Sequence, residues 1–554
     1  MKHTFSSITA CIAVSFLVPF FLFFGILFPL PVLLSAETSK KITADKTFEA
    51  NSGFQPKAEI DRILLASLQK KNMKPAPLCS DAVFIRRIYL DLLGIIPPAA
   101  EVREFLQNTN RNKRSILIGK VLNRPEFVDY QTMRWCDILR VKSEFPINLW
   151  PNGAMCYYRW LHSAVENNMP YDAMVRSLIL AEGSNFRDGA SNFYRAVSDK
   201  NAETIAETAA QTFLGLRPDV WSPEQHKNFA VFFSRIGFKE TAQWKEEIVY
   251  RIRKPLDSNE VIFPDGTKKT VKPEQDPREV LADWLTSPEN QQFNRNIANR
   301  IWYWLFGFGL VDEPDDFRKE NPPVHPQVLD YLADKLVKEK YNLKKLYSII
   351  LDSAAYQQSS IPKAKQAEDK EYFASYPIRR IEAEVLQDIF ITIFDLPITY
   401  IYEVPEPFTY IRPRFKTVVL SDSGISNSFL EMFGRASRDT GFESDRNNGI
   451  TESQELFLVN STEVNNWVAR YVQMDPAFAE RKKIPAKRGI SEEQREEIKK
   501  FVNDAWLTFL SRYPSQEESK AILEELTDLD KPGIQRVQDI IWALLNTKEF
   551  LCRH

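Results

Sequence analysis

Cysteine, histidine and glycine are scarce in this sequence. The 554 residues include five Cys, five His and 18 Gly, so the glycine share is less than half the usual value of about 7%. Few cysteines and histidines leave little material for a metal centre or a thiol nucleophile, and we expect neither a metal nor another cofactor. Few glycines disfavour glycine-rich loop architectures and favour helices.

The sequence also lacks an excess of charge of either sign. Its 72 Lys and Arg residues nearly balance 74 Asp and Glu residues, so nucleic acid is not an expected partner. Standard signatures are missing too: there is no His-Glu-x-x-His, no Gly-x-Ser-x-Gly and no phosphate loop ending in Gly-Lys-Ser or Gly-Lys-Thr. These absences exclude the hydrolase and nucleotide-binding classes that depend on those motifs.

One long apolar run stands at the N-terminus. No charged residue occurs from Thr4 to Ala36, and Lys2 precedes the run. This pattern is typical of an export signal, and about 20 apolar residues also suffice to span a bilayer. We therefore expect a signal peptide or an N-terminal anchor at residues 1–36 and a polar tether at 37–57. The body is expected in the periplasm, the cell envelope or the medium, touching the membrane only through the N-terminal segment.

An exported chain can form disulfides. Cys136 and Cys156 are one candidate pair, and two separate thiols are an equal alternative, because spacing in the sequence does not decide between them.

Apolar residues recur at helical spacing along most of the body, as in Phe84, Ile88 and Leu92. Glycines at 183, 215 and 237 are expected to end helices. The pattern changes near residues 245–272, where short β-type runs flank Asp265-Gly266, a hairpin turn signal. The predicted fold is mainly α, with two multi-helix domains at residues 58–236 and 276–554 joined by a small insertion, residues 237–275, that contains a β-hairpin.

One internal repeat is visible. Tyr89–Glu101 matches Trp506–Glu518, and Leu122–Phe127 matches Leu545–Phe550. Each copy predicts a helix, a turn ending in Pro where the next helix begins, and a later Asn-x-x-Glu-Phe segment. We favour duplication over convergence, and either origin indicates packing units rather than reaction centres.

Several ordered motifs resemble a known pair of domains. The motifs are Phe84-Ile-Arg-Arg-Ile-Tyr-Leu-Asp, Phe213-Leu-Gly-Leu-Arg, Asp276-Pro-Arg-Glu-Val-Leu-Ala-Asp-Trp-Leu, Arg380-Ile-Glu-Ala-Glu and Gly434-Arg-Ala-Ser-Arg-Asp-Thr. In them the chain resembles the Planctomycete cytochrome-associated (PSCyt-type) domain followed by the Planctomycete-specific (PSD-type) domain. The resemblance implies an exported protein of unknown function.

The chain departs from that family pattern at two places. Typical relatives carry Cys-x-x-Cys-His after the Phe-Leu-Gly motif, whereas here Arg217 runs directly into Pro218. Typical relatives carry Cys-x-Cys-Glu-Arg in the second domain, whereas here the positions hold Phe442-Glu-Ser-Asp-Arg446. We hypothesise that both segments build one redox or metal site in relatives and that this chain has lost it as a unit.

Arginines and carboxylates concentrate in the second domain at residues 435–446, next to a long loop that spans roughly 395–425. The planar guanidinium group of arginine binds carboxylates, sulfates or phosphates of a ligand, and it also pairs with buried carboxylates that hold a protein core together. Both a structural ion-pair network and an anion or sugar site therefore stay open as interpretations of these residues. His325 is the best lone candidate for a general base. The candidate ligand-binding residues are Arg435, Arg438, Asp439, Glu443, Arg446, Asp315, Asp316 and His325.

The expected function is a non-catalytic binding or assembly component whose partner is a polysaccharide or another envelope protein. One alternative is a carbohydrate-active hydrolase, which two carboxylates about 5–10 Å apart in an arginine-lined pocket would favour. Glu382 and Glu384 alone are a poor acid–base pair, because residues two apart lie on different helix faces. A redox or metal protein is the other alternative.

Overall fold

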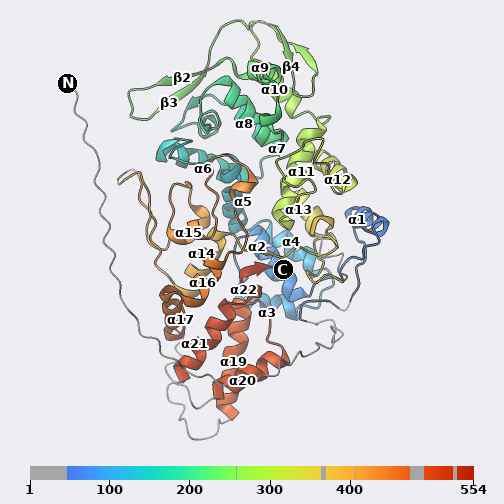
Figure 1. Cartoon of the computed structure of the whole chain (residues 1–554), viewed down its shortest axis with the longest axis vertical. Helices are drawn as coiled ribbons and strands as arrows, with labels where there is room; N and C mark the ends of the chain where they lie inside the picture. The colour runs from blue at the N-terminus through green and yellow to red at the C-terminus, as the bar shows by residue number, and fades with distance from the viewer. Residues whose placement is uncertain are drawn as a thin grey trace, which may run out of the picture. The chain divides into compact units, whose positions relative to one another are not determined.

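The computed structural model describes residues 47–50, 52–256, 259–363, 370–405, 407, 409–474, 492–527 and 533–554 (Figure 1). The expected signal or anchor segment at 1–36 lies outside these residues, as do residues 37–46 and 51 of the expected tether. Within the described ranges, no helix is both long and apolar enough to cross a membrane.

Helices form most of the regular structure, so the predicted mainly α fold is confirmed. Those of the first half are α1 (Glu59–Lys70), α2 (Asp81–Leu92), α3 (Ala99–Gln107), α4 (Lys113–Val121), α5 (Pro125–Ile138), α6 (Trp150–Glu166), α7 (Tyr171–Ile179), α8 (Ala202–Leu214) and α9 (Pro223–Ala230). Those of the second half are α10 (Pro277–Leu285), α11 (Gln291–Phe306), α12 (Pro326–Lys338), α13 (Leu343–Leu351), α14 (Ala383–Phe394), α15 (Ser428–Met432), α16 (Glu452–Asn460), α17 (Thr462–Met474), α19 (Glu492–Phe509), α20 (Gln516–Thr527), α21 (Gly533–Leu545) and α22 (Lys548–Leu551).

The strands are short and form small antiparallel sheets. They are β1 (Gly183–Ser184), β2 (Ile236–Glu240), β3 (Glu247–Arg251), β4 (Glu260–Ile262), β5 (Lys268–Thr270), β6 (Arg379–Arg380) and β7 (Cys552–Arg553). One sheet has the order β1-β3-β2, β4 pairs with β5, and β6 pairs with β7. The β4–β5 hairpin turns at Asp265-Gly266, as predicted, in the stretch between the two helical regions.

The glycines do not all end helices. Gly215 follows α8 in the left-handed conformation, as predicted. The predictions for Gly183 and Gly237 are wrong, because Gly183 lies in β1 and Gly237 in β2. A Cβ atom at Gly237 would approach the ring of Tyr250 on β3 to 2.7 Å, so close packing between strands, rather than a helix end, requires glycine there.

The interior contains two apolar clusters. The larger one packs residues from α1 to α13 together with Phe373, Ala374 and Tyr376 and with Leu507 of α19, and the smaller one packs mainly residues from α14 to α22. The smaller cluster also includes Leu90 from α2 and Tyr130 and Met133 from α5. Helices of the first half therefore help to form the core of the second half.

The two copies of the repeat share an ionic arrangement. In each copy one arginine contacts two glutamates at equivalent repeat positions: Arg124 contacts Glu101 and Glu126 at 3.0 and 2.9 Å, and Arg512 contacts Glu518 and Glu549 at 2.7 and 2.6 Å. The arginine itself comes from a different position in each copy. This shared pairing of carboxylates supports duplication.

Candidate functional site

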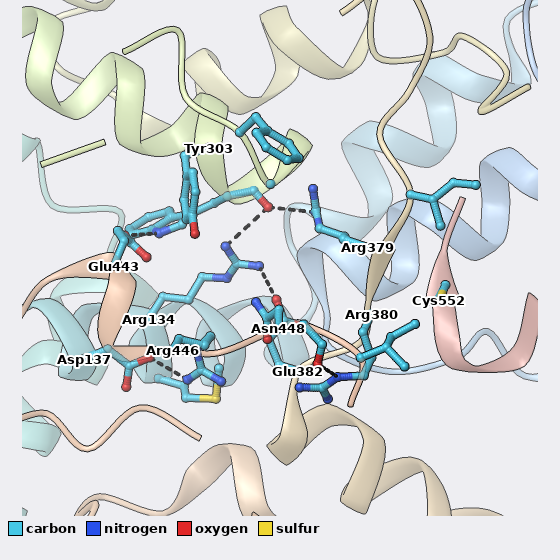
Figure 2. Close-up of a pocket in the computed structure, with 17 residues that line it drawn as sticks. Arg134, Asp137, Tyr303, Arg379, Arg380, Glu382, Glu443, Arg446, Asn448 and Cys552 are labelled. Atoms are coloured by element: carbon cyan, nitrogen blue, oxygen red, sulfur yellow. Dashed lines mark hydrogen bonds and ion pairs between the residues drawn. The ribbon is translucent and has the colours of Figure 1, made fainter. Parts of the chain in front are cut away.

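Two arginines meet at the C-terminal end of α11. Arg379 donates hydrogen bonds to the carbonyls of Leu305 and Trp304 at 2.8 and 3.0 Å, and Arg134 donates to Trp304 at 3.3 Å (Figure 2). Carbonyls at a helix C-terminus lack partners within the helix and favour nearby cations. Gly307 permits this approach, because it has a φ of +76° and a Cβ there would lie 2.6 Å from Cδ of Arg379.

The Asp91 network is a buried row in which three arginines alternate with two carboxylates. Its order is Arg379, Asp91, Arg553, Glu382 and Arg134. The N–O distances are 2.8 Å for Arg379–Asp91, 3.0 Å for Arg553–Asp91 and 3.4 Å for Arg134–Glu382, and Arg553 also pairs with Glu382. The β6–β7 pairing, which sets Arg379 opposite Arg553, holds the row together.

The Asp137 network repeats this stoichiometry with different residues. Its order is Arg438, Asp137, Arg446, Glu384 and Arg435, with N–O distances of 2.8, 2.6, 2.6 and 3.4 Å along the row. The side chains are buried or nearly so. Glu382 and Glu384 thus belong to different networks: Glu382 precedes α14 as its N-cap residue, and Glu384 lies in the first turn of α14.

The arginines keep both glutamates ionised. Burial opposes ionisation of Glu382, but Arg553 and then Arg134 outweigh it and hold the pKa well below its usual range. Arg446 does the same for the pKa of Glu384. Neither carboxylate is poised to carry a proton near neutral pH.

Positive charge exceeds negative charge around these networks. Arg380 donates only to carbonyl oxygens, at 2.8 Å to Ile381, 2.6 Å to Phe433, 2.8 Å to Asn447 and 3.3 Å to Gly449. Burial lowers the pKa of Arg380 to about 10, so the side chain stays cationic at neutral pH. Among the described residues, the two networks and Arg380 bring together seven arginines and four carboxylates.

Glu443 is held differently. Arg300 contacts Asp315 at 2.5 Å and lies 3.7 Å from Glu443, so two carboxylates share one arginine. The backbone N–H of Glu443 donates to Asp315 at 2.8 Å, and the indole of Trp304 donates to the Glu443 carboxylate at 2.6 Å. Burial, together with repulsion from Asp315, raises the pKa of Glu443 to about 7.

These groups surround a cavity of about 440 Å³. Arg134, Arg379, Arg380, Glu382, Asp137, Arg446 and Glu443 line it, and so do Tyr303, Trp304, Phe308, Asn448 and Cys552 (Figure 2). Two of the polar atoms at this cavity, Nε of Arg134 and Oδ1 of Asn448, are buried and have no hydrogen-bond partner in the described structure. The cavity therefore combines an excess of arginine, an aromatic wall, one unused donor and one unused acceptor.

The structure brings five of the predicted site residues together. Glu443 and Arg446 line the cavity. Arg435 and Arg438 lie in the Asp137 network without lining the cavity, and Asp315 contacts Arg300 beside Glu443.

The other three lie elsewhere. Asp439 pairs with Lys142 at 2.6 Å, and Asp316 pairs with Arg318 at 2.6 Å. The His325 ring is within hydrogen-bond distance of the Ser67 hydroxyl at 2.9 Å and of the Tyr372 carbonyl. Burial lowers the pKa of His325, and none of these three side chains lines the cavity.

Sequence reasoning missed Arg134, Asp137, Arg379 and Arg553 as site residues. Arg134 and Asp137 are charged positions, three residues apart, within the mostly buried helix α5. A buried charge requires a partner, so a charged pair in an apolar helix was the available signal. Arg553 lies far along the sequence from its partners, and no local sequence pattern identifies it as a site residue.

The cysteines are free thiols in the described structure. Cys79, Cys136 and Cys552 are buried, and Cys156 is partly buried. No group of three or more His, Cys, Asp or Glu side chains with a metal-binding arrangement occurs among the described residues.

The two segments that hold cysteines in typical relatives lie against each other here. The Arg217 guanidinium lies 4.7 Å from the centre of the Phe442 ring. Gln211, on the helix before the first segment, donates to the Thr440 carbonyl at 2.9 Å. This contact is what the hypothesis of one shared site in relatives requires.

The architecture is that of a helical protein whose two halves share a core and an arginine-rich cavity. The sequence matches the family PSCyt2, described as a protein of unknown function (DUF1549), over residues 59–220, and the family PSD1, described as a protein of unknown function (DUF1553), over residues 277–526. The chain therefore belongs to the proteins that carry a PSCyt2 domain followed by a PSD1 domain, as its motifs predict. No curated protein and no solved structure matches the chain.

Proposed function

We propose that this protein is a non-catalytic binding component whose cavity takes an acidic ligand, such as the end of a uronic acid-containing polysaccharide. The charges at the cavity carry this proposal: Arg134, Arg379, Arg380 and Arg446 line it with three carboxylates, Asp137, Glu382 and Glu443. Arg380 donates only to carbonyl oxygens and has no carboxylate partner among the described residues. Uncompensated charge is costly in a low-dielectric interior, so an anionic group bound at the cavity would stabilise the arrangement.

The remaining lining fits the rest of such a ligand. Tyr303, Trp304 and Phe308 supply an aromatic wall against which a sugar ring can pack. The unused N–H of Arg134 can donate to a ligand oxygen, and the unused carbonyl oxygen of Asn448 can accept from a ligand hydroxyl. A few placed polar groups in a partly apolar cavity are typical of small-molecule sites.

The carboxylates at the cavity favour binding over catalysis. Asp137 and Glu382 each contact two arginines. Arg553 and Arg134 hold the pKa of Glu382 well below its usual range, which makes this carboxylate a weak base.

A carbohydrate-active hydrolase is the second candidate function. One observation favours it: Glu443 borders the cavity, contacts the Trp304 indole and has its pKa raised to about 7, which suits a general acid. Hydrolysis also requires a base or nucleophile, and the other two carboxylates at the cavity, Asp137 and Glu382, are each engaged by two arginines. Release of reducing ends from an acidic oligosaccharide, abolished in Glu443→Gln, would establish the hydrolase in place of the binding protein.

The proposal includes a location outside the cytoplasm. It rests on the uncharged run from Thr4 to Ala36 behind Lys2. The proposed partners are an acidic polysaccharide or another envelope protein, and nucleic acid is not among them because the charges of the chain nearly balance. Fractionation of cells that express the full chain tests this location, which recovery in the cytoplasm would contradict.

Isothermal titration calorimetry with trigalacturonate and its methyl ester tests the binding role. The two sugars share a shape, and only the acid carries carboxylates. We expect the acid to bind at least about tenfold more tightly. Equal affinity for both would refute an anion site.

Variants locate the binding. Arg380→Gln removes the cation that has no carboxylate partner and should weaken trigalacturonate binding at least about tenfold. Arg176→Gln is the matched control, because Arg176 forms an exposed pair with Asp283 at 2.7 Å. If Arg380→Gln does not fold, the comparison of acid with ester on the unaltered protein still decides the question.

A further inference from the structure

A column of three stacked aromatic rings ends at a second cavity. The centroids of Phe232 and Phe263 lie 5.1 Å apart, and those of Phe263 and Trp284 lie 4.7 Å apart, with interplanar angles of 23° and 15°. Phe232 and Phe263 are buried, whereas Trp284 is partly exposed and lines a cavity of about 470 Å³. Phe263 covers one face of the indole, and the described residues place no second ring on Trp284.

Hydrogen bonds fix the Trp284 ring at the cavity. Its indole N–H donates to the Asp265 carboxylate at 3.3 Å, and the Asn290 amide donates to its backbone carbonyl at 3.2 Å. Asp265 is oriented in turn by Thr267, whose backbone N–H and hydroxyl donate to it at 2.9 and 2.7 Å. The aromatic surface is therefore set before any ligand arrives, which lowers the entropic cost of binding.

The lining of this cavity differs in charge from that of the first. Neither arginine nor lysine lines it, and its charged residues are Asp265 and Glu289. The exposed Gln291 amide adds a donor and an acceptor. The Asn290 amide is engaged by Trp284 and Phe293, and the Gln292 amide donates to the Leu214 carbonyl at 2.5 Å. This lining disfavours an anion and suits an uncharged ligand with many hydroxyl groups.

We propose that this second cavity binds a neutral saccharide with a pyranose ring stacked on Trp284. A pyranose with equatorial hydroxyls presents axial C–H groups on its flat face, and the face of an aromatic ring is negatively polarised and attracts them. Carboxylate and amide side chains around the ring pair with the equatorial hydroxyls. β-1,4-Linked glucose units have this all-equatorial arrangement.

The second site is independent of the first. The two cavities share no lining residue, and their ligands differ in charge. The two proposals therefore fail or succeed separately.

Titration of the full chain with cellohexaose tests the second site. We expect the unaltered protein to bind cellohexaose with millimolar or tighter affinity. The affinity should fall at least about tenfold in Trp284→Ala and only about threefold in Trp284→Phe, because phenylalanine keeps a ring at the end of the column. Gln291→Ala changes an exposed side chain and should weaken binding without affecting folding. Trp244→Ala is the control, because Trp244 is 70% exposed and lines neither cavity.

Three results would overturn this proposal. They are no binding of cellohexaose to the unaltered protein at millimolar concentration, equal binding by Trp284→Ala, and an equal loss in Trp244→Ala. Arg380→Gln should bind cellohexaose like the unaltered protein. A loss of trigalacturonate binding without a loss of cellohexaose binding would show that only the first cavity had been altered.

Discussion

Arg446 donates to Glu384 through both terminal nitrogens, at 2.6 and 3.0 Å. This bidentate contact joins the loop after α15 to the start of α14, and the Asp137 contact of Arg446 extends it to α5. Two parallel hydrogen bonds from one planar guanidinium fix both the distance and the orientation of the two side chains. The contacts of Arg446 therefore connect α5 in the first half of the chain with α14 in the second half, at the edge of the cavity.

Replacing Arg446 with Gln should destabilise the protein strongly. The change leaves Glu384, whose side chain is 1% exposed, with only the longer contact to Arg435. Removing one partner of a buried pair typically costs about 3–5 kcal/mol, and urea unfolding measures it. Arg176→Gln, in an exposed pair, should cost about 0–1 kcal/mol. Equal costs for the two variants would show that burial of the network does not matter.

Asp388 predicts a pH dependence of stability. Burial raises the pKa of Asp388 to about 6, although the N–H groups of Thr417 and Val418 donate to it at 2.5 and 3.1 Å. A carboxyl whose pKa is raised on folding stabilises the protein fully below its unfolded value, near 4, and this contribution is lost as the pH rises through about 6.

Asp388→Asn should therefore flatten the fall in stability between about pH 4 and pH 6. Unfolding free energies measured across that window for the two proteins give the difference directly. Asp334→Asn, at an exposed position, is the control and should leave the slope unchanged. The same slope in Asp388→Asn and in the unaltered protein would contradict the assignment.

Much of the helical framework could be predicted from periodicity, because α3, α8 and α11 carry regular apolar stripes with recognisable ends. Strand β2 was missed, because its glycine resembles a helix stop in sequence. Glu443 and Arg446 could be predicted as site residues from local charge density. Arg553 could not, because a β6–β7 pairing across more than a hundred residues brings it to Asp91 and Glu382, and no local pattern encodes that pairing.

The repeat predicts two comparable ionic contacts. Arg124→Ala and Arg512→Ala should each lower the unfolding free energy, because each arginine joins two glutamates. Arg512 should cost more, because its side chain is 6% exposed and that of Arg124 is 26% exposed. Thermal unfolding of the two variants measures the difference. An unchanged unfolding free energy in Arg512→Ala would contradict a shared structural role of the two arginine–glutamate contacts.

The contact between Arg217 and Phe442 makes a prediction about relatives that carry both cysteine pairs. Substituting only the second pair should lower the content of the bound metal or haem, because the two segments are adjacent in this fold. Elemental analysis and absorbance of the purified relative measure the loss. Unchanged content would contradict a shared site.

A crystal structure of the protein with trigalacturonate decides whether the arginine-rich cavity binds an acidic saccharide. We expect a ligand carboxylate within the cavity, in hydrogen-bond distance of at least one of Arg134, Arg379, Arg380 and Arg446, with a sugar ring against Tyr303 or Trp304. A trisaccharide bound only outside this cavity, or a cavity that holds no ligand at a saturating concentration, would contradict this expectation.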